Sequence, residues 1–402
     1  MRLVMLVGWL AAASPMSVTA APPKDFKPLF NEKSLDGWHG WAVAEKGASP
    51  AELAKLTAAE RAAKFEAWTA DAKKHWTVTG GELVGDGTGP ALATEKEYGD
   101  IELLAEFKTA AKAESVISLR GSPVAHVGKL LPEWNTLRIL QVGERTTVYL
   151  NGKVVVDFAR VENTWDSKLP LPKVGKILLP ALGGESRWRK LHVREIPAKE
   201  ANDLLVTHAN EGFDSVFNGK DFTGWDGPID NYEVVENAIV CKPKKGGNIF
   251  TKAEFADHIV RLEYRLPPGG NNGLAMRYPG MGHVATLAMC ELQILDDTDP
   301  KYAKLDPRQF NGSAYGTAAA HRGFLRPVGE WNFIEVTAKG STLRAELNGT
   351  RILDIDMSKI TEFQGNTPHP GKDRTKGHFG FAGHNDPVAF RNIRIKDIGD
   401  KK

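Results

Sequence analysis

This chain of 402 residues has only two cysteines, almost no excess of one charge over the other, and few long apolar runs. The only cysteines are Cys241 and Cys290, so at most one disulfide can form, and two cysteines alone cannot build a zinc site of the usual kind. We expect two buried thiols on different strands, with a disulfide as the alternative. Because 52 basic residues nearly balance 50 acidic ones, the composition gives no reason to expect nucleic acid or an anionic membrane surface as a partner.

The one long apolar run lies at the N-terminus, after Arg2. Small residues over 18–21 come after it and offer a cleavage site, a pattern typical of a secretory signal peptide. An uncleaved membrane anchor is the alternative, but the run is short for a span and is closed by Pro15. We therefore expect residues 1–21 to be removed, and the mature protein to be secreted or periplasmic and without a membrane span.

Blocks of sequence recur in the same order in the two halves of the chain. Residues 30–38 (FNEKSLDGW) reappear as 217–225 (FNGKDFTGW). The other pairs of blocks are 98–108 with 255–265, 133–152 with 330–349, and 188–196 with 390–398. Because four blocks keep one order, we expect a duplicated domain. Copy one spans 25–197, a linker spans 198–212, and copy two spans 213–398.

Both copies have the pattern of antiparallel β-sheets. Short alternating segments such as 101–108, 115–120 and 135–142 predict strands, and Asn151-Gly152 predicts a tight hairpin, since Asn and Gly tolerate positive φ. With no strand–helix–strand rhythm, the pattern favours an all-β sandwich in each copy. Copy one has an extra stretch near 44–75, rich in Ala, Glu and Lys, which predicts an inserted helix or helical pair.

Copy two has an extra segment of its own, and this segment contains a predicted strand over 290–297. Its residues alternate, with Glu291 and Gln293 on one face and apolar residues on the other. A regular strand would add Asp297 to the polar face and turn Asp296 away, whereas a bulge would reverse the two acids. A carboxylate here could act as a base or accept hydrogen bonds from sugar hydroxyls. A solvated strand shows the same pattern.

Asn271 and Arg277, which precede this strand in the sequence, are further candidates. Regular strand geometry over 271–277 puts Asn271 and Arg277 on one face. Arg277 could hold a substrate oxygen, because a guanidinium presents a rigid fork of donors. It could equally form a structural ion pair, because copy one has Arg120 at this position.

Three more polar residues distinguish copy two from copy one. Tyr315 lies between glycines in a loop, where it could present its phenol to a ligand or pack against the protein. His384 stands where copy one has Leu182, which suggests a polar site in copy two alone, although a histidine in a surface turn is the alternative. His283 belongs to the extra segment.

Copy two resembles the 3-keto-disaccharide hydrolase domain family through seven motifs in order. These lie at 217–225, 271–277, 291–297, 312–316, 330–332, 347–349 and 388–396. Copy one shares the opening, Glu-Trp-Asn, Asn-Gly and closing motifs but lacks the acidic strand, the tyrosine loop and the histidine, so it is a degenerate copy. The resemblance implies two tandem concanavalin A-like jelly rolls, with the ligand on the concave sheet.

The resemblance also implies cleavage of glycosides that are oxidised at sugar carbon 3. A ketone at carbon 3 acidifies the hydrogen at carbon 2, so a base can remove it and the glycosidic oxygen can leave, with water adding afterwards. By resemblance, the catalytic candidates are Glu291, His384, Tyr315 and Asp296. The substrate-binding candidates are Arg277, Gln293, Asn271, Asp297 and His283. Glu291, Asp296 and His384 could also hold a divalent metal.

Three functions are compatible with these residues. The first is an exported enzyme acting on 3-keto-glycosides through copy two, by hydrolysis or by elimination and hydration. The second is a non-catalytic, lectin-like carbohydrate-binding protein, and the third is a structural assembly protein. An enzyme predicts that the candidates converge, with at least one perturbed pKa, whereas a structural role predicts that they scatter. Copy one is expected to be inactive and to serve as a scaffold or a glycan contact.

Overall fold

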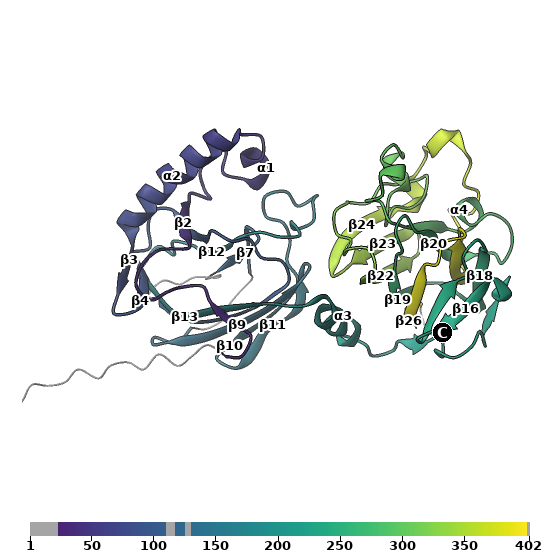
Figure 1. The fold of residues 1–402 in the computed structure, drawn as a ribbon, viewed down its shortest axis with the longest axis horizontal. Helices are drawn as coiled ribbons and strands as arrows, with labels where there is room; N and C mark the ends of the chain where they lie inside the picture. Colours follow the sequence, from purple (N-terminus) through teal and green to yellow (C-terminus); the bar gives the residue numbers. More distant parts are fainter. Residues whose placement is uncertain (1–22, 110–116, 125–129, 400–402) are drawn as a thin grey trace, which may run out of the picture.

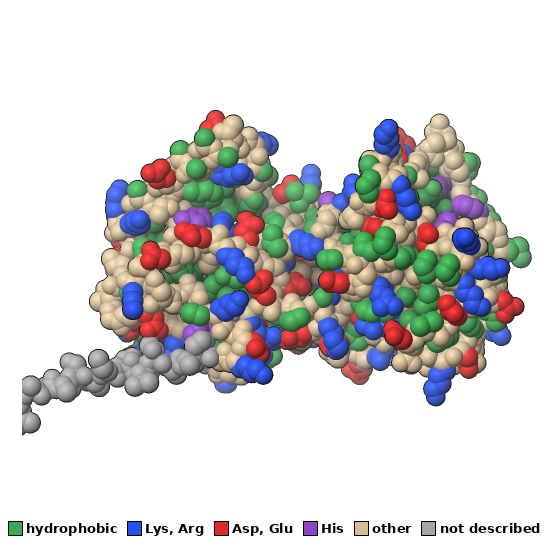
Figure 2. Space-filling view, viewed as in Figure 1, with side chains coloured by type: hydrophobic (Ala, Val, Ile, Leu, Met, Phe, Trp, Pro, Cys, Tyr) green, Lys and Arg blue, Asp and Glu red, His purple; other side chains and the backbone are tan. Residues whose placement is uncertain are grey.

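The computed structural model describes residues 23–109, 117–124 and 130–399. The predicted signal peptide, residues 1–21, and the start of the strand predicted over 115–120 lie outside these residues. Figure 1 shows two β domains joined through the helix α3 (Ala198–Thr207). Within the described ranges, no helix is both long enough and apolar enough to span a bilayer. On the face drawn in Figure 2, Lys and Arg side chains are interspersed with Asp and Glu over both domains, as the balanced composition leads one to expect.

The first domain consists of two antiparallel sheets. Its large sheet has the order β11-β10-β9-β6-β13-β4-β3, with β1 paired to β13, and its small sheet has the order β2-β5-β12-β7-β8. The bounds are β1 (Lys27–Pro28), β2 (Trp38–Trp41), β3 (Trp76–Thr79), β4 (Glu82–Gly85), β5 (Ala91–Thr94), β6 (Ile101–Thr109), β7 (Ser118–Leu119), β8 (Ser122–Pro123), β9 (Asn135–Val142), β10 (Arg145–Leu150), β11 (Lys153–Arg160), β12 (Ile177–Leu179) and β13 (Ser186–Glu195).

The second domain repeats this topology. Its large sheet has the order β16-β17-β26-β19-β22-β23-β24, with β14 paired to β26, and its small sheet has the order β15-β18-β25-β20-β21. The bounds are β14 (Asp214–Ser215), β15 (Trp225–Asp226), β16 (Tyr232–Val235), β17 (Ala238–Cys241), β18 (Gly247–Phe255), β19 (His258–Arg265), β20 (Asn271–Tyr278), β21 (Cys290–Leu295), β22 (Trp331–Lys339), β23 (Thr342–Leu347), β24 (Thr350–Asp356), β25 (Gly377–Gly383) and β26 (Ala389–Asp397). The predicted fold, two tandem β-sandwiches of the jelly-roll kind, is confirmed.

Each domain buries its core between its two sheets. The tryptophans that open the two copies, Trp38 and Trp225, are both buried there. Their indole N–H groups donate to equivalent backbone carbonyls, those of Leu29 and Val216, each at 2.9 Å. Both cysteines are free, buried thiols: Cys241 lies on β17 of the large sheet and Cys290 on β21 of the small sheet. The expected pair of thiols on different strands is confirmed.

The predicted insertion in copy one is helical, with α1 (Pro50–Leu53) and α2 (Ala58–His75). A capping box between Thr57 and Glu60 starts α2, which satisfies backbone N–H groups at its N-terminus. The helix lies directly on β2, where a Cβ atom on Gly40 would come within 2.1 Å of the carbonyl oxygen of Trp68. Trp41, Trp68 and Leu178 meet in an apolar cluster there, so the insertion covers the outer face of the small sheet.

The two domains meet through hairpin turns. The N–H of Glu144, in the β9–β10 turn, donates to the carbonyl of Gly349 in the β23–β24 turn (3.0 Å). The buried Glu144 carboxylate accepts hydrogen bonds from the N–H groups of Leu171 (2.9 Å) and Arg351 (3.2 Å). Glu346 adds ion pairs with Arg351 of its own domain and Arg145 of the first domain. We call these contacts the interdomain joint.

Candidate active site

The outer face of the second domain's small sheet carries most of the candidate residues. On β21 the side chains of Leu292 and Ile294 enter the core, so Glu291 and Gln293 face the other way. Across the strand pair, Glu291 lies opposite Ala275 and Gln293 lies opposite Gly273. The polar row predicted from the alternation of this strand is therefore set against small residues of β20, which leave room above the sheet.

Glu291 is held over a glycine. A Cβ atom on Gly273 would lie 2.3 Å from Oε1 of Glu291, so only glycine leaves space for this carboxylate. The Glu291 side chain is 5% exposed. A carboxylate with so little access to water interacts strongly with any charge beside it.

His384 supplies that neighbouring charge. It directly follows β25, and its Nε2 lies 3.6 Å from Oε1 of Glu291. The Glu291 carboxylate, as hydrogen-bond acceptor and as charge, raises the pKa of His384 above its usual range, against the effect of burial; the charge of Asp386 acts in the same direction. The imidazole is 46% exposed, so it stays accessible to a molecule on this face.

An amide chain extends the site along the sheet. Nε2 of Gln293 donates to Oδ1 of Asn271 at 2.6 Å, and the backbone N–H of Asn271 donates to Oδ2 of Asp386 at 3.1 Å. The structure thus joins Gln293 and Asn271, both predicted, to Asp386, which we did not single out. The signal for Asp386 was its place two residues after His384 in the same turn.

Tyr315 borders the same row. Ala314 forms a bridge with Leu292, and the N–H of Tyr315 donates to the carbonyl of Glu291 at 2.9 Å. This register puts Tyr315 beside Glu291 on the outer side of the sheet. Its hydroxyl accepts a hydrogen bond from Gln309 at 2.8 Å, which fixes the orientation of the phenol.

The two acids at the end of β21 serve other contacts. The Asp296 carboxylate accepts hydrogen bonds from the N–H of Gly269 (2.8 Å) and from Thr298, which closes the turn after the strand. Asp297 pairs with Arg322 at 3.2 Å, and its pKa is raised by burial in spite of that cation. Neither of these contacts brings Asp296 or Asp297 to the Glu291–His384 pair.

The prediction that Arg277 shares a face with Asn271 is wrong. The pairing of β20 with β25 shifts between Ala275 and Tyr278, and Arg277 has φ of 52°, so its side chain turns into the protein. The buried guanidinium donates to the carbonyls of Ala256, Gly340 and Arg374 and pairs with Asp257 at 2.8 Å. Arg120 makes the equivalent contacts in copy one, including an ion pair with Asp100 at 3.2 Å. The arginine is a structural element of both domains.

Two histidines lie farther along the site. His283 is exposed and directly precedes the short helix α4 (Val284–Leu287). His369, which no sequence pattern singles out, is buried and stacks on Phe363 with ring centroids 4.9 Å apart. Its ring lies against Gly316, the residue after Tyr315, and burial lowers its pKa, with the charge of His283 acting in the same direction.

The predicted metal ligands do not converge. Glu291 and His384 lie together, but Asp296 closes its own turn, and the described residues contain no group of three or more His, Cys, Asp and Glu side chains that could hold an ion. Protein metal sites normally use three or more such ligands. These residues therefore do not fit a metal, and no reaction step is assigned to one.

Comparison with known proteins decides the family. Residues 25–130, 122–194 and 212–396 match the family described as the 3-keto-alpha-glucoside-1,2-lyase-like domain. The chain belongs to this family. Both copies match, which agrees with the duplication seen in the sequence and in the topology.

Individual relatives cover about half of the chain. A 3-keto-disaccharide hydrolase of Bacteroides thetaiotaomicron is 23% identical over 244 residues, which are 50% of this chain and 84% of the relative. A candidate glycosyl hydrolase of Parabacteroides distasonis is 23% identical, with a TM-score of 0.43 over 47% of this chain and 95% of its own. The carbohydrate-binding module CBM66 of Bacillus subtilis is 12% identical, with a TM-score of 0.30 over 44% of this chain and 98% of its own.

The two family domains differ at the face where the candidates lie. In the first domain α1 and α2 pack over the small sheet, and Leu182 stands at the position of His384. In the second domain the same face carries Glu291, His384 and the amide chain. The polar arrangement is therefore a feature of the second domain.

Proposed function

We propose that the second domain cleaves glycosides whose sugar is a ketone at carbon 3, in an exported protein. Membership of the 3-keto-alpha-glucoside-1,2-lyase-like family and the name of the Bacteroides thetaiotaomicron relative support this substrate class. The observation that carries the proposal is the Glu291–His384 pair, which combines an accessible imidazole with a buried carboxylate.

In the proposed reaction, neutral His384 takes the proton from carbon 2, which the ketone has made acidic. The electrons of that C–H bond form a double bond between carbons 1 and 2, and the bond from carbon 1 to the glycosidic oxygen breaks. Glu291 stabilises the imidazolium that forms, because opposite charges attract strongly where water is excluded. Water then adds its hydroxyl to carbon 1 and a proton to carbon 2, which gives net hydrolysis.

The remaining residues bind and orient in this proposal. Gln293 and Asn271 present amide groups that can donate to and accept from sugar hydroxyls. In this proposal Tyr315, whose hydroxyl accepts a hydrogen bond from Gln309, gives a proton to the departing oxygen. Such donors contribute when they are oriented before the substrate arrives.

The test is turnover of a 3-keto-glucoside by the mature protein and by His384→Ala and Glu291→Ala. We expect both variants to lose at least ~100-fold in kcat/KM, the usual scale for a general base and its partner. His321→Ala, an exposed histidine of the same domain, is the matched control and should keep full activity. Turnover that His384→Ala leaves intact would refute the assignment. Sugar binding without turnover by the unaltered protein would instead support the lectin-like alternative.

The route is tested by running the reaction in D2O. Elimination followed by hydration places deuterium at carbon 2 of the product, because the proton added there comes from solvent. Direct hydrolysis keeps the original hydrogen. If the product at full conversion still carries protium at carbon 2, His384 does not remove the proton from that carbon.

A parallel reaction with a chelator tests whether turnover needs a divalent metal.

A further inference from the structure

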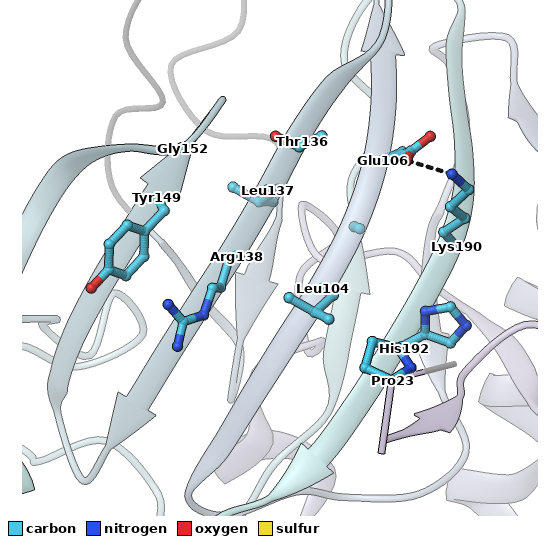
Figure 3. Close-up of a pocket in the computed structure, with 11 residues that line it drawn as sticks. Pro23, Leu104, Glu106, Thr136, Leu137, Arg138, Tyr149, Gly152, Lys190 and His192 are labelled. Atoms are coloured by element: carbon cyan, nitrogen blue, oxygen red, sulfur yellow. Dashed lines mark hydrogen bonds and ion pairs between the residues drawn. The ribbon is translucent and has the colours of Figure 1, made fainter. Parts of the chain in front are cut away.

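The outer face of the first domain's large sheet contains a cavity of about 580 Å³. Figure 3 shows its floor at Leu104, with Tyr149 and Arg138 on one side and His192 and Pro23 on the other. This face belongs to a different sheet and a different domain from Glu291 and His384, so the cavity is separate from the candidate active site.

Four of the lining residues, Tyr149, Arg138, Leu104 and His192, belong to a single row that crosses the sheet. Pairs directly opposite one another on neighbouring strands link six positions, from the edge strand β11 to β1. In order, the row is Val154, Tyr149, Arg138, Leu104, His192 and Pro28. Five steps at about 4.8 Å between strands make it roughly 24 Å long.

The duplicated domain provides an internal comparison for this row. The same six positions of the second domain are linked by the same pairings. They hold Arg351, Glu346, Glu335, Arg261, Arg394 and Ser215. Charged side chains there form a ladder, in which Glu335 pairs with Arg261 at 2.5 Å and Glu346 pairs with Arg351 and with Arg145 of the joint.

In the first domain, uncharged side chains replace most of that ladder. Val154 stands for Arg351, Tyr149 for Glu346 and Leu104 for Arg261. Val154 is 50% exposed at the edge of the sheet. Since both sheets have the same topology, the fold does not require these residues.

The cations at the cavity are already neutralised. Arg138 pairs with Glu102 at 2.6 Å and stacks over Tyr149, with its guanidinium 4.9 Å from the ring centroid. Lys190 pairs with Glu106 at 2.7 Å. Burial lowers the pKa of His192, and the charge of Lys190 acts in the same direction against that of Glu32, so the imidazole is neutral near pH 7. A site with matched charges favours a neutral ligand over a phosphate or a carboxylate.

We propose that this row is a binding groove for a neutral glycan chain. Sugar rings combine apolar C–H faces with hydroxyls. The faces suit Leu104 and Tyr149 in the cavity and Val154 beside Tyr149 on the edge strand; the hydroxyls suit the hydroxyl of Thr136 and the donors of Arg138, Lys190 and His192. The groove runs across the strands, so an extended chain can lie along its whole length. The first domain then holds a glycan while the second domain acts on its own substrate.

The test is affinity electrophoresis of the mature full-length protein in gels that contain xyloglucan, mixed-linkage β-glucan or pullulan, with alginate as the anionic arm. We expect retardation in at least one neutral gel. Tyr149→Ala and Val154→Arg should each weaken it about tenfold, the scale of a lost aromatic or apolar contact. Val154→Arg restores the residue of copy two at an exposed position, so it should not unfold the domain.

His384→Ala separates this proposal from the proposed function, because it should abolish turnover and leave retardation unchanged. Loss of retardation in His384→Ala, with Tyr149→Ala unaffected, would place glycan binding in the second domain and overturn the groove. Retardation in alginate alone, or in no gel, would overturn it as well.

Discussion

At the scale of single residues, the site depends on one missing side chain. The carboxylate of Glu291 occupies the space that a Cβ atom would need on Gly273, and His384 meets it from the end of β25. The pair is therefore fixed by a strand pairing on one side and by a turn on the other. Its position and its charge can each be altered by one substitution.

Gly273→Ala should displace the Glu291 carboxylate, since the new methyl would lie 2.3 Å from Oε1. We expect at least ~10-fold loss of kcat/KM and a destabilisation of about 1–3 kcal/mol from overpacking. Gly99→Ala is the control, because its Cβ would have contacts no closer than 3.6 Å. Steady-state kinetics with thermal melts of both variants check this prediction. Unchanged kinetics in Gly273→Ala would show that the position of Glu291 does not matter.

The pH dependence of turnover should report the raised pKa of His384. The base is the neutral imidazole, so kcat/KM falls as the pH drops through that pKa. Glu291→Gln removes the negative charge that favours the imidazolium, so the acidic limb should move to lower pH, toward the ordinary histidine value near ~6.5. Profiles of kcat/KM against pH for both proteins test the sign, and a limb that moves upward would contradict it.

The Glu291–His384 pair should stabilise the fold at low pH, whereas it supports turnover at high pH. A raised pKa in the folded state means that the imidazolium stabilises the fold below the unfolded-state pKa. This contribution is lost as the pH rises through the folded-state pKa. Because His384 is nearly half exposed, the effect should be small.

At the scale of elements, the alternation of strands and the offsets between repeats predicted most of the fold. Strands such as β9 (Asn135–Val142) and the helices inserted near 44–75 follow from local patterns. The face on which Arg277 lies could not be predicted from local patterns. A shift in register and one positive φ turn its side chain inward, and the residues around it give no local signal for either. Pattern reasoning also selected Glu291, Gln293 and His384 but could not find His369, whose position depends on loops far apart in the sequence.

Arg277→Met tests the structural role of that arginine. The substitution removes the ion pair with Asp257 and the hydrogen bonds to three backbone carbonyls, so we expect a loss of about 3–5 kcal/mol in the free energy of unfolding. The measurement is urea unfolding, with Arg344→Met of β23, whose side chain is 38% exposed, as control. If KM rises severalfold while stability stays unchanged, Arg277 contacts substrate after all.

At the scale of the whole molecule, the interdomain joint links the two domains through a buried charged group. Glu144 is fully buried, and its carboxylate accepts hydrogen bonds from both domains, from Leu171 and from Arg351. Arg160 lies 3.6 Å away as its cation. Removing one member of such a group leaves the others buried and unpaired, which costs more than the contact itself contributes.

Glu144→Ala should therefore destabilise the joint by about 3 kcal/mol or more, the scale for breaking a buried charged network. We expect calorimetry to show two separate melting transitions in place of coupled unfolding. Glu162→Ala is the control, since its exposed carboxylate also pairs with Arg160, at 2.7 Å, and exposed pairs contribute only about 0–1 kcal/mol. A single transition at the original temperature in Glu144→Ala would show that the domains are held together elsewhere.

The interdomain joint also constrains the order of the two copies along the chain. It pairs the β9–β10 turn of one copy with the β23–β24 turn of the other, which are different positions within the repeat. The β10–β11 turn of the first copy corresponds to the β23–β24 turn of the second. In this β10–β11 turn Gly152 is exposed, and Val154 stands where the second copy has Arg351. The two copies are not interchangeable within this joint, because a chain with the copies in reverse order would bring Ser341, which stands at the position of Glu144 in copy two, to the turn that contains Gly152. The contacts of the joint thus tie the order of the two copies in the chain to the residues at these two turns.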